Sequence, residues 1–334
     1  MSQKRKPIQI SSIKELQKIG RDPNYPLNGY YELVQDIDAS ETVNWNNGAG
    51  FKPIGATFNP FKGKFDGKGH KITGLYIYKS ILVEENRLSN SGLFSTTSSS
   101  AEIKNVVMEN AILSVWGYTG ALVGFNEGTV SNCYSIKCSL SGHYSVGGLV
   151  GENRGTVSGC YSSSKVIGEK CDTGGLVGWN QGTIINCCNT GSVIKSNMRV
   201  GGLTGINVGT IINSYNTGSV SGGGSVGGLV GENFNVISNC YNQGSVYGIG
   251  NVGGLVGEST GGKVTNSYNI GSISGVRSVG GLIGYIEVRG SIITNSYNTG
   301  SLSGKHEVRE LVGFAEKEVT IINTYNRNSI TEIC

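Results

Sequence analysis

One phrase of seven residues returns along most of this chain at intervals of 26 to 29 residues. Gly-Gly-Leu-Val-Gly-Glu-Asn at 147–153 recurs with one change at 174–180 and unchanged at 227–233. Its leucine position holds Leu122, Leu149, Leu176, Leu203, Leu229, Leu255, Leu282 and Leu311. A unit this short cannot bury its own apolar side, so neighbouring units must stack on one another. The repeat therefore predicts a solenoid.

Each unit carries three apolar segments that are too short for helices and rich in β-branched residues. Glycine is unusually frequent, with 54 of 334 residues, but it has no G-X-Y period, which excludes collagen. Three short strands with tight turns fit about 27 residues. We expect an all-β protein, a parallel β-solenoid (β-helix) of three-strand coils. The usual hand of parallel crossovers favours right-handed winding.

The repeat also predicts which side chains stack from coil to coil. The leucine, the Val/Ile of the second segment and the Val/Ile/Leu of the third are expected to point inward. An asparagine column is expected at a bend, since Asn tolerates positive φ, and the paired glycines are expected to supply turns with positive φ. A tyrosine column is expected to be stacked and partly exposed. The Asn column is Asn132, Asn186, Asn213, Asn239, Asn266, Asn295 and Asn323, and the Tyr column is Tyr134, Tyr161, Tyr215, Tyr241, Tyr268, Tyr297 and Tyr325.

These phrases, together with Asn-Cys-Tyr-Asn and Gly-Ser-Val, resemble the GLUG-motif repeat of bacterial surface proteins. That group includes adhesin-like proteins and the non-catalytic repeat region of IgA-cleaving metallopeptidases. The stretches 51–55 and 61–70 resemble the segment that often precedes such repeats, so the resemblance covers about residues 27–330. It implies a surface solenoid and no particular activity. The chain departs from the motif at Arg309-Glu310, which replace Gly-Gly, and at Cys188, which replaces Tyr.

The chain divides by its sequence into three parts. Residues 1–75 are predicted to form an N-terminal cap and first strands, 76–118 irregular early coils, and 119–334 regular GLUG-type coils. Within 11–20 we expect a short capping helix with Ser12 as N-cap, Glu15 in a capping box and Gly20 as its stop. At the other end of the rod, an unpaired strand edge would favour end-to-end self-association. The charges at 309, 310 and 316–318 are expected to oppose it.

The sequence predicts no catalytic, cofactor-binding or metal site. Its three histidines, His70, His143 and His306, are far apart, and no Cys pair has zinc spacing. Glu152, Glu232 and Glu258 share one repeat position; a stacked pair of them could act as acid and base or bind a cation. The favoured interpretation is an exposed variable position. Cysteines at 133, 160, 187 and 240 alternate with Ser and Thr, which favours buried free thiols.

The expected function is that of a non-enzymatic extracellular or cell-surface scaffold with an adhesive or structural role. Two alternatives are a carbohydrate-active β-helix (polysaccharide lyase or glycoside hydrolase) and an intracellular scaffold. An ice-binding face is disfavoured because it needs a regular Thr column, which we do not expect. The net charge is only +4, and the chain has no concentrated basic face of the kind that binds nucleic acid. It also contains no run of 18 apolar residues, so membrane insertion is not expected.

Four aromatic residues occupy the same variable position as the glutamates: Phe125, Trp179, Tyr285 and Phe314. Exposed aromatic side chains are favoured in interfaces, so these four are the candidate ligand contacts. The expected partner is a host or environmental glycan or protein. We expect a secreted or cell-surface location, although no signal peptide is visible in this chain.

Overall fold

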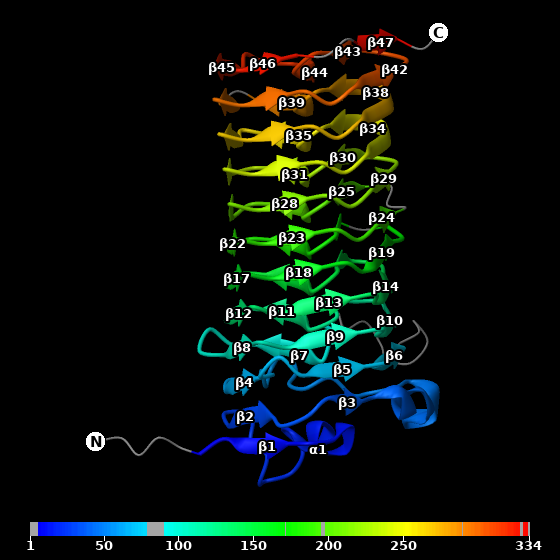
Figure 1. Cartoon of the computed structure of the whole chain (residues 1–334), viewed down its shortest axis with the longest axis vertical. Helices are drawn as coiled ribbons and strands as arrows, with labels where there is room; N and C mark the ends of the chain where they lie inside the picture. Colours follow the sequence, from blue (N-terminus) through cyan, green and yellow to red (C-terminus); the bar gives the residue numbers. More distant parts are fainter. Residues whose placement is uncertain are drawn as a thin grey trace, which may run out of the picture.

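The chain winds into a straight rod of stacked coils, from α1 at one end to β47 at the other (Figure 1). The structure is a computed structural model that describes residues 6–78, 90–170, 172–194, 198–288, 290–327 and 330–332. Every strand pair in its four sheets is parallel, with partners about one repeat apart in the sequence. The predicted fold class, a parallel β-solenoid with a period of about 27 residues, is confirmed.

Sheet A has 12 strands. They are β1 (Ile8–Ile10), β2 (Tyr30–Leu33), β4 (Lys64–Asp66), β8 (Glu102–Lys104), β12 (Thr129–Ser131), β17 (Thr156–Ser158), β22 (Thr183–Ile185), β27 (Thr210–Ile212), β32 (Val236–Ser238), β36 (Lys263–Thr265), β40 (Ile292–Thr294) and β45 (Thr320–Ile322). Sheet B has 11 strands. They are β3 (Ile37–Asp38), β5 (Lys71–Thr73), β9 (Val107–Glu109), β13 (Tyr134–Ile136), β18 (Tyr161–Ser162), β23 (Cys188–Asn189), β28 (Tyr215–Asn216), β33 (Tyr241–Asn242), β37 (Tyr268–Asn269), β41 (Tyr297–Asn298) and β46 (Tyr325–Asn326).

Sheet C has 15 strands in two arms. The first arm is β6 (Tyr76–Tyr78), β10 (Ile112–Val115), β14 (Ser139–Gly142), β19 (Lys165–Gly168), β24 (Val193–Ile194), β29 (Val220–Gly222), β34 (Val246–Gly253), β38 (Ile273–Gly280), β42 (Leu302–Gly304) and β47 (Ile330–Glu332). The second arm is β15 (Ser145–Gly147), β20 (Asp172–Gly174), β25 (Arg199–Gly201), β30 (Ser225–Gly227) and β43 (Val308–Arg309), and it joins the first arm at β34 and β38. Sheet D has nine strands. They are β7 (Phe94–Thr97), β11 (Val123–Asn126), β16 (Val150–Asn153), β21 (Val177–Asn180), β26 (Thr204–Asn207), β31 (Val230–Asn233), β35 (Val256–Thr260), β39 (Ile283–Val288) and β44 (Val312–Ala315).

A single coil visits the sheets in the order D, A, B, C and the second arm of C. The coil that starts at Val150 does so through β16, β17, β18, β19 and β20. Coils therefore contain more strands than the three expected. The Tyr-Asn and Ser-Val-Gly segments also form strands, because stacking pairs their backbone with the next coil even where only two or three residues are extended.

The N-terminal helix α1 (Ile13–Lys18) lies at the end of the rod beside β1 (Figure 1). The Ser12 hydroxyl accepts the N–H of Glu15, and the Glu15 carboxylate accepts the N–H of Ser11, one residue earlier than a capping box requires. Gly20 follows with φ +77°. Ile13 and Leu16 are buried in the core, so the helix covers the apolar end as predicted. Two short 3-10 helices, η1 (Ser40–Asn44) and η2 (Asn46–Gly48), follow α1 in the sequence. The division of the chain into three parts stays a prediction.

The three apolar columns point inward, as expected. Seven of the eight column leucines have no exposed surface, and the second-segment residues from Val130 to Ile293 have none either. The columns open at the last coil, where Leu311 is half-buried and Ile321 is 41% exposed. Ile321 keeps its register with Ile293, but its side chain is exposed because no following coil covers it among the described residues.

Asparagine marks two kinds of bend. All seven members of the predicted column have φ between 48 and 55°, and some of their amides bond to each other along the rod. Two further ladders, not expected from the sequence, are buried. In the ladder at the end of sheet D, Asn153 Nδ2 donates to Asn180 Oδ1 at 2.9 Å, and Asn180 Nδ2 to Asn207 Oδ1 at 2.8 Å. The second ladder runs along sheet B through Asn189 and Asn216. Each amide also satisfies a corner carbonyl, so the ladders replace water inside the turns.

The paired glycines serve close packing and not positive φ, which corrects the expectation. Gly147 and Gly148 are absent from the positive-φ residues. A Cβ atom on Gly148 would lie 2.1 Å from the carbonyl oxygen of Gly175 in the next coil, and one on Gly147 would lie 2.0 Å from the Val150 oxygen. Backbone approaches of this kind require glycine at the corner between the second arm of sheet C and sheet D.

Two columns lie on the surface of the rod. The rings of Tyr215, Tyr241, Tyr268, Tyr297 and Tyr325 stack as predicted, with centroids 4.8–5.3 Å apart, and they are half-buried or exposed. Tyr134 and Tyr161 do not stack but meet edge to face at 61°, which corrects the prediction for these two. A threonine column, which we did not expect, occupies sheet A: Thr129, Thr156, Thr183 and Thr210 are in register and accessible. The column ends at Val236.

Five cysteine thiols are free and buried: Cys133, Cys138, Cys160, Cys187 and Cys240. Burial raises the pKa of Cys240 to about 12, and burial with the neighbouring Cys133 raises the pKa of Cys160 well above its usual value. Cys188 is half-buried, while Cys171 and Cys334 lie outside the described residues.

The buried thiols are therefore expected to be unreactive in the native protein. Burial keeps the reagent away from all five thiols, and at about pH 8 those with a strongly raised pKa, such as Cys160 and Cys240, hold almost no thiolate, which is the reactive form. Labelling with a maleimide, followed by peptide mapping, should modify these five cysteines only after unfolding in guanidinium. Labelling of Cys160 at the same rate before and after unfolding would contradict the assignment.

Candidate functional site

Sheet D presents one column of side chains beside the strands of the second arm of sheet C. Backbone pairing places the column residues in register: Phe125, Glu152, Trp179, Ile206, Glu232, Glu258, Tyr285 and Phe314. Residues at or just before the start of the second-arm strands, such as Asp172 and Arg199, lie against this column. We call this column, with the second-arm residues that contact it, the seam.

The predicted contact residues share the seam but form two separate groups. Phe125 and Trp179 flank Glu152 in the early coils, and the Tyr285 and Phe314 rings stack at 6.0 Å in the last ones. Seven coil steps of about 4.8 Å separate Phe125 from Phe314, so one small ligand cannot touch all four. All four side chains are half-buried rather than fully exposed.

The early group surrounds a buried carboxylate. Glu152 has no exposed surface, and its Oε1 accepts from Arg154 Nε at 2.8 Å and from Gln181 Nε2 at 2.9 Å. The Arg154 guanidinium also lies 4.8 Å from the centre of the Phe125 ring. The expectation of an exposed position was wrong for Glu152 and for Glu232, which is 6% exposed, because the second arm of sheet C and the neighbouring coils cover the column.

Two polar atoms in this group lack a hydrogen-bond partner among the described residues. They are Glu152 Oε2, an acceptor, and Trp179 Nε1, a donor, and both are buried. Their residues are register partners on β16 and β21. Tyr118 packs on Phe125 with ring centroids 6.2 Å apart, and burial, followed by the charge of Glu152, raises the pKa of Tyr118 to about 12. The group thus places aromatic rings beside a buried carboxylate oxygen and a buried indole N–H, and Tyr118 also interacts with the Glu152 carboxylate.

The middle of the seam is an ion cluster. Arg199 bonds Asp172 at 3.2 Å and pairs with Glu232, while Ser225 donates to Glu258 at 2.6 Å. Burial raises the pKa of Asp172 and of Glu232, although the charge of Arg199 opposes both shifts. The stacked Glu232 and Glu258 are therefore held by Arg199 and by Ser225. Among the described residues, no cluster of His, Cys, Asp or Glu is arranged to bind a metal ion.

Sequence reasoning missed the partners of these carboxylates. Asp172 and Arg199 begin strands of the second arm of sheet C, and Tyr118 precedes Thr119, which bridges to Val146 of that arm; the phrase there differs from coil to coil. The glutamate position was visible in the repeat, but Arg199 and Glu232 are 33 residues apart, more than one period. Only the register between coils brings them together.

The geometry defines the class of this protein as a parallel β-solenoid with a mixed aromatic and ionic seam. The family model described as "The GLUG motif" matches residues 142–167 and 222–247, which are corresponding parts of two coils. Two coils of this chain thus carry the GLUG motif.

Two relatives share part of the sequence. This chain is 34% identical to halomucin of Haloquadratum walsbyi over 131 residues, which are 38% of the chain. It is 35% identical to the "Putative Gly-rich membrane protein" of Evansella cellulosilytica over 133 residues, which are 39% of the chain. The matches span 1% and 14% of the lengths of those proteins.

Two solved structures are similar to the rod. One is described as a "putative immunoglobulin A1 protease" from Bacteroides ovatus, with 17% identity, a TM-score of 0.44, and coverage of 98% of this chain and 85% of that chain. The other is described as "IgA1 Protease", with 18% identity, a TM-score of 0.49, and coverage of 96% of this chain and 21% of that chain.

Within the described residues, no helix has the length and apolar character needed to cross a membrane.

Proposed function

We propose that this protein is a non-enzymatic solenoid scaffold, secreted or held at the cell surface, whose seam binds a glycan at Glu152. The observation that carries the proposal is the buried pair of unsatisfied atoms, Glu152 Oε2 and Trp179 Nε1, beside aromatic rings. A sugar hydroxyl can donate to the carboxylate and another can accept from the indole, while a ring face packs on Phe125 or Trp179. Buried polar atoms of this kind gain most from a ligand that supplies both partners.

The scaffold role rests on the architecture. A rod of near-identical coils holds its surface columns at fixed spacing, which suits presentation of a contact face. The names of the two relatives, a mucin-type name and a membrane protein, favour a surface location.

A carbohydrate-active enzyme is the alternative, and the Glu232–Glu258 pair is the feature that favours it. The two residues are register partners on adjacent coils, and the pKa of Glu232 is raised. A retaining glycosidase needs one carboxylate free to attack and one to donate a proton. Here Arg199 neutralises Glu232, and Ser225 with Asn251 holds Glu258, which favours a structural role. Release of reducing sugar from polysaccharides that disappears in Glu232→Gln would establish the enzyme instead.

Trp179→Ala is expected to weaken glycan binding about tenfold or more, because it removes both the ring and the unsatisfied donor. The measurement is a glycan array, followed by titration calorimetry with the strongest hit. Phe234→Ala is the matched control, since Phe234 is a 40% exposed aromatic outside the column. Equal binding by Trp179→Ala and wild type, or binding of no glycan on the array, would exclude the seam as the contact face.

A further inference from the structure

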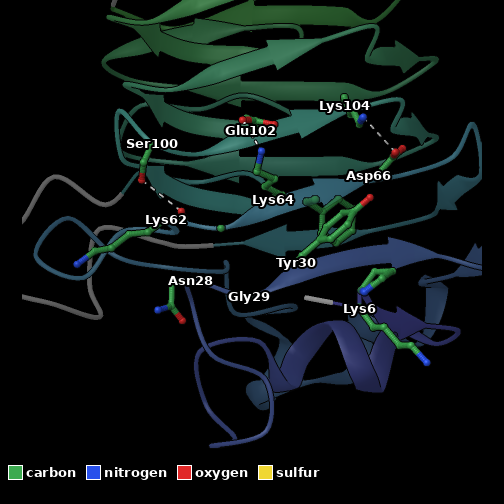
Figure 2. A pocket seen from close by; sticks show the side chains of 13 residues that line it. Lys6, Asn28, Gly29, Tyr30, Lys62, Lys64, Asp66, Ser100, Glu102 and Lys104 are labelled. Atoms are coloured by element: carbon green, nitrogen blue, oxygen red, sulfur yellow. Dashed lines mark hydrogen bonds and ion pairs between the residues drawn. The ribbon is translucent and has the colours of Figure 1, made fainter. Parts of the chain in front are cut away.

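A second concave surface lies near the N-terminal end of the rod, on the outer side of sheet A. A cavity of about 700 Å³ is bounded by β2, β4 and β8, by the chain at Lys6-Pro7 and by the loop before β4. Figure 2 shows Lys62, Lys64 and Tyr30 around it. The Ser100 hydroxyl holds the loop by donating to the Lys62 carbonyl at 3.2 Å. We call this cavity the lysine groove.

The lining of the lysine groove carries more positive than negative charge. Its four lysines are Lys6, Lys62, Lys64 and Lys104, and its two carboxylates are Asp66 and Glu102. Lys64 pairs with Glu102 at 2.7 Å, and Lys104 with Asp66 at 3.4 Å. Among the described residues, neither Lys6 nor Lys62 forms an ion pair, and both are exposed. Two cationic groups at the groove are thus available to a ligand.

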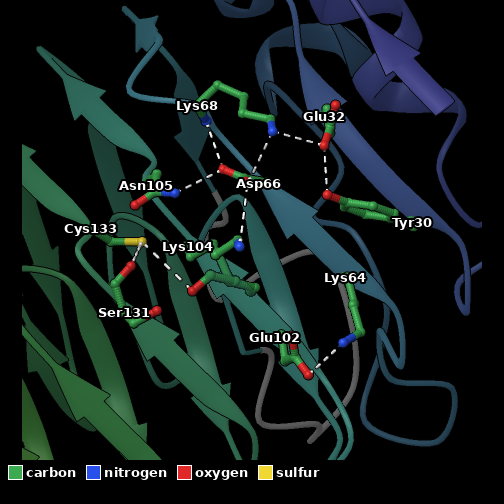
Figure 3. A network of polar contacts seen from close by, with 11 residues as sticks. Tyr30, Glu32, Lys64, Asp66, Lys68, Glu102, Lys104, Asn105, Ser131 and Cys133 are labelled. Carbon is green, nitrogen blue, oxygen red and sulfur yellow. Dashed lines mark hydrogen bonds and ion pairs between the residues drawn. The ribbon is translucent and has the colours of Figure 1, made fainter. Parts of the chain in front are cut away.

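The buried carboxylate of the groove, that of Asp66, forms hydrogen bonds and ion pairs within the protein. Figure 3 shows Asp66, 4% exposed, surrounded by Lys68, Lys104 and Asn105. The Asn105 amide donates to it at 2.9 Å, and the backbone N–H of Lys68 also donates at 2.9 Å. Burial alone would raise the pKa of Asp66, but these bonds and charges outweigh it, so the pKa lies below its usual value. Asp66 is therefore ionised, and its charge is compensated by Lys68 and Lys104, which limits its repulsion of an incoming anion.

The ring of Tyr30 is fixed in the same groove. Its hydroxyl donates to Glu32 Oε1 at 2.5 Å, and Glu32 in turn pairs with Lys68 at 2.9 Å (Figure 3). Tyr30 remains half-buried, so part of its surface faces the groove. An aromatic ring held in place beside unpaired cations suits a ligand that combines a flat or ring-shaped body with a negative charge.

We infer that the lysine groove binds an acidic polysaccharide, with carboxylate or sulfate groups at Lys62 and Lys6 and a sugar ring near Tyr30. A peptide that adds as a strand is disfavoured, because β2, β4 and β8 each pair with neighbours on both sides and offer no free backbone edge. The cationic side chains among the described residues that line the groove are all lysines, which suits single anionic groups more than bidentate phosphate recognition. This site is separate from the seam and does not depend on its role.

The test compares Lys6→Gln/Lys62→Gln with wild type by titration calorimetry. The probes are polygalacturonate for carboxylates, heparin for sulfates, dextran as a neutral glucan and polyglutamate as an acidic peptide. We expect wild type to bind at least one acidic polysaccharide and neither dextran nor polyglutamate with comparable strength. The double variant should bind about tenfold more weakly, and the wild-type affinity should fall as salt is added.

Lys263→Gln is the matched control, since Lys263 is an exposed lysine on the same face of sheet A, several coils away. It should bind within about twofold of wild type. An equal loss in Lys263→Gln would show diffuse charge attraction and overturn the inference. So would unchanged binding by the double variant, or equal binding of polyglutamate. Because Trp179 lies far along the rod, Trp179→Ala should leave this binding intact, so failure of the groove and failure of the seam can be told apart.

Discussion

Leu203→Ala is expected to lower the free energy of unfolding by about 2–5 kcal/mol, the range for a buried leucine that is truncated in a packed core. Leu203 is fully buried in the centre of the rod. Its carbonyl accepts the N–H of Leu176 at 3.1 Å, and its N–H donates to the Leu229 carbonyl at 2.8 Å. The leucine column is thus tied to the backbone ladder, so the site has little room to collapse around a cavity. Urea denaturation followed by circular dichroism measures the change.

Val208→Ala provides the control within the same coil. Val208 is 42% exposed, so its truncation removes little buried surface and should cost less than about 0.5 kcal/mol. If the two variants were equally stable, the leucine column could not be the core of the coil.

Arg199→Met is expected to cost about 3 kcal/mol at neutral pH, because it leaves two largely buried carboxylates without their cation. Arg199 bonds Asp172 and Glu232, whose side chains are 14% and 8% exposed. Since the Arg199 side chain is itself one-third exposed, we place the cost at the lower end of the range for broken buried pairs. Methionine keeps most of the apolar stem, so lost packing contributes little.

The pH dependence of the free energy of unfolding shows whether lost charge pairing causes the destabilisation of Arg199→Met. Folding raises the pKa of Asp172 and of Glu232, so their protonated forms favour the folded state. The stability that these two groups contribute is fully present below their unfolded pKa values and is lost as the pH rises through the folded ones. Removal of Arg199 makes that loss larger. The gap between Arg199→Met and wild type should therefore shrink as the pH falls from about 8 to about 4.

Lys71→Met serves as a control for a surface ion pair. Lys71 lies 3.3 Å from Glu109, and its side chain is 46% exposed. Pairs of this kind contribute about 0–1 kcal/mol, so this variant should stay close to wild type at every pH. A gap for Arg199→Met that did not change with pH would point to packing and not to charge.

The tyrosine stack shows how far a periodic sequence can be extended into three dimensions. Seven tyrosines at one repeat position predicted a stacked and partly exposed column, and the rings from Tyr215 onward lie within 5° of parallel. The prediction succeeded for these five tyrosines because neighbours in a parallel ladder are identical positions, so a column in the sequence becomes a column in space. It failed for Tyr134 and Tyr161, whose rings meet edge to face.

The paired glycines and Glu152 show where the same reasoning failed. A repeated glycine can serve a positive φ or a close backbone approach, and the repeat does not distinguish the two. For Gly148 the structure shows a close approach, because the carbonyl oxygen of Gly175 leaves no room for a Cβ atom. Glu152 seemed exposed because its column varies between charged and aromatic residues. Its burial depends on the second arm of sheet C, which packs beside sheet D.

The sequence by itself determined the period, the inward columns and the asparagine bends, because each is set by residues that recur at one interval and meet only their own copies. The tertiary structure decided everything that lies between unlike positions. Arg199 reaches Glu232 across 33 residues, and Lys62 and Tyr30 border one groove although the N-terminal coils do not repeat. Such contacts depend on the lateral packing of different sheets, and lateral packing leaves no periodic signal in a chain.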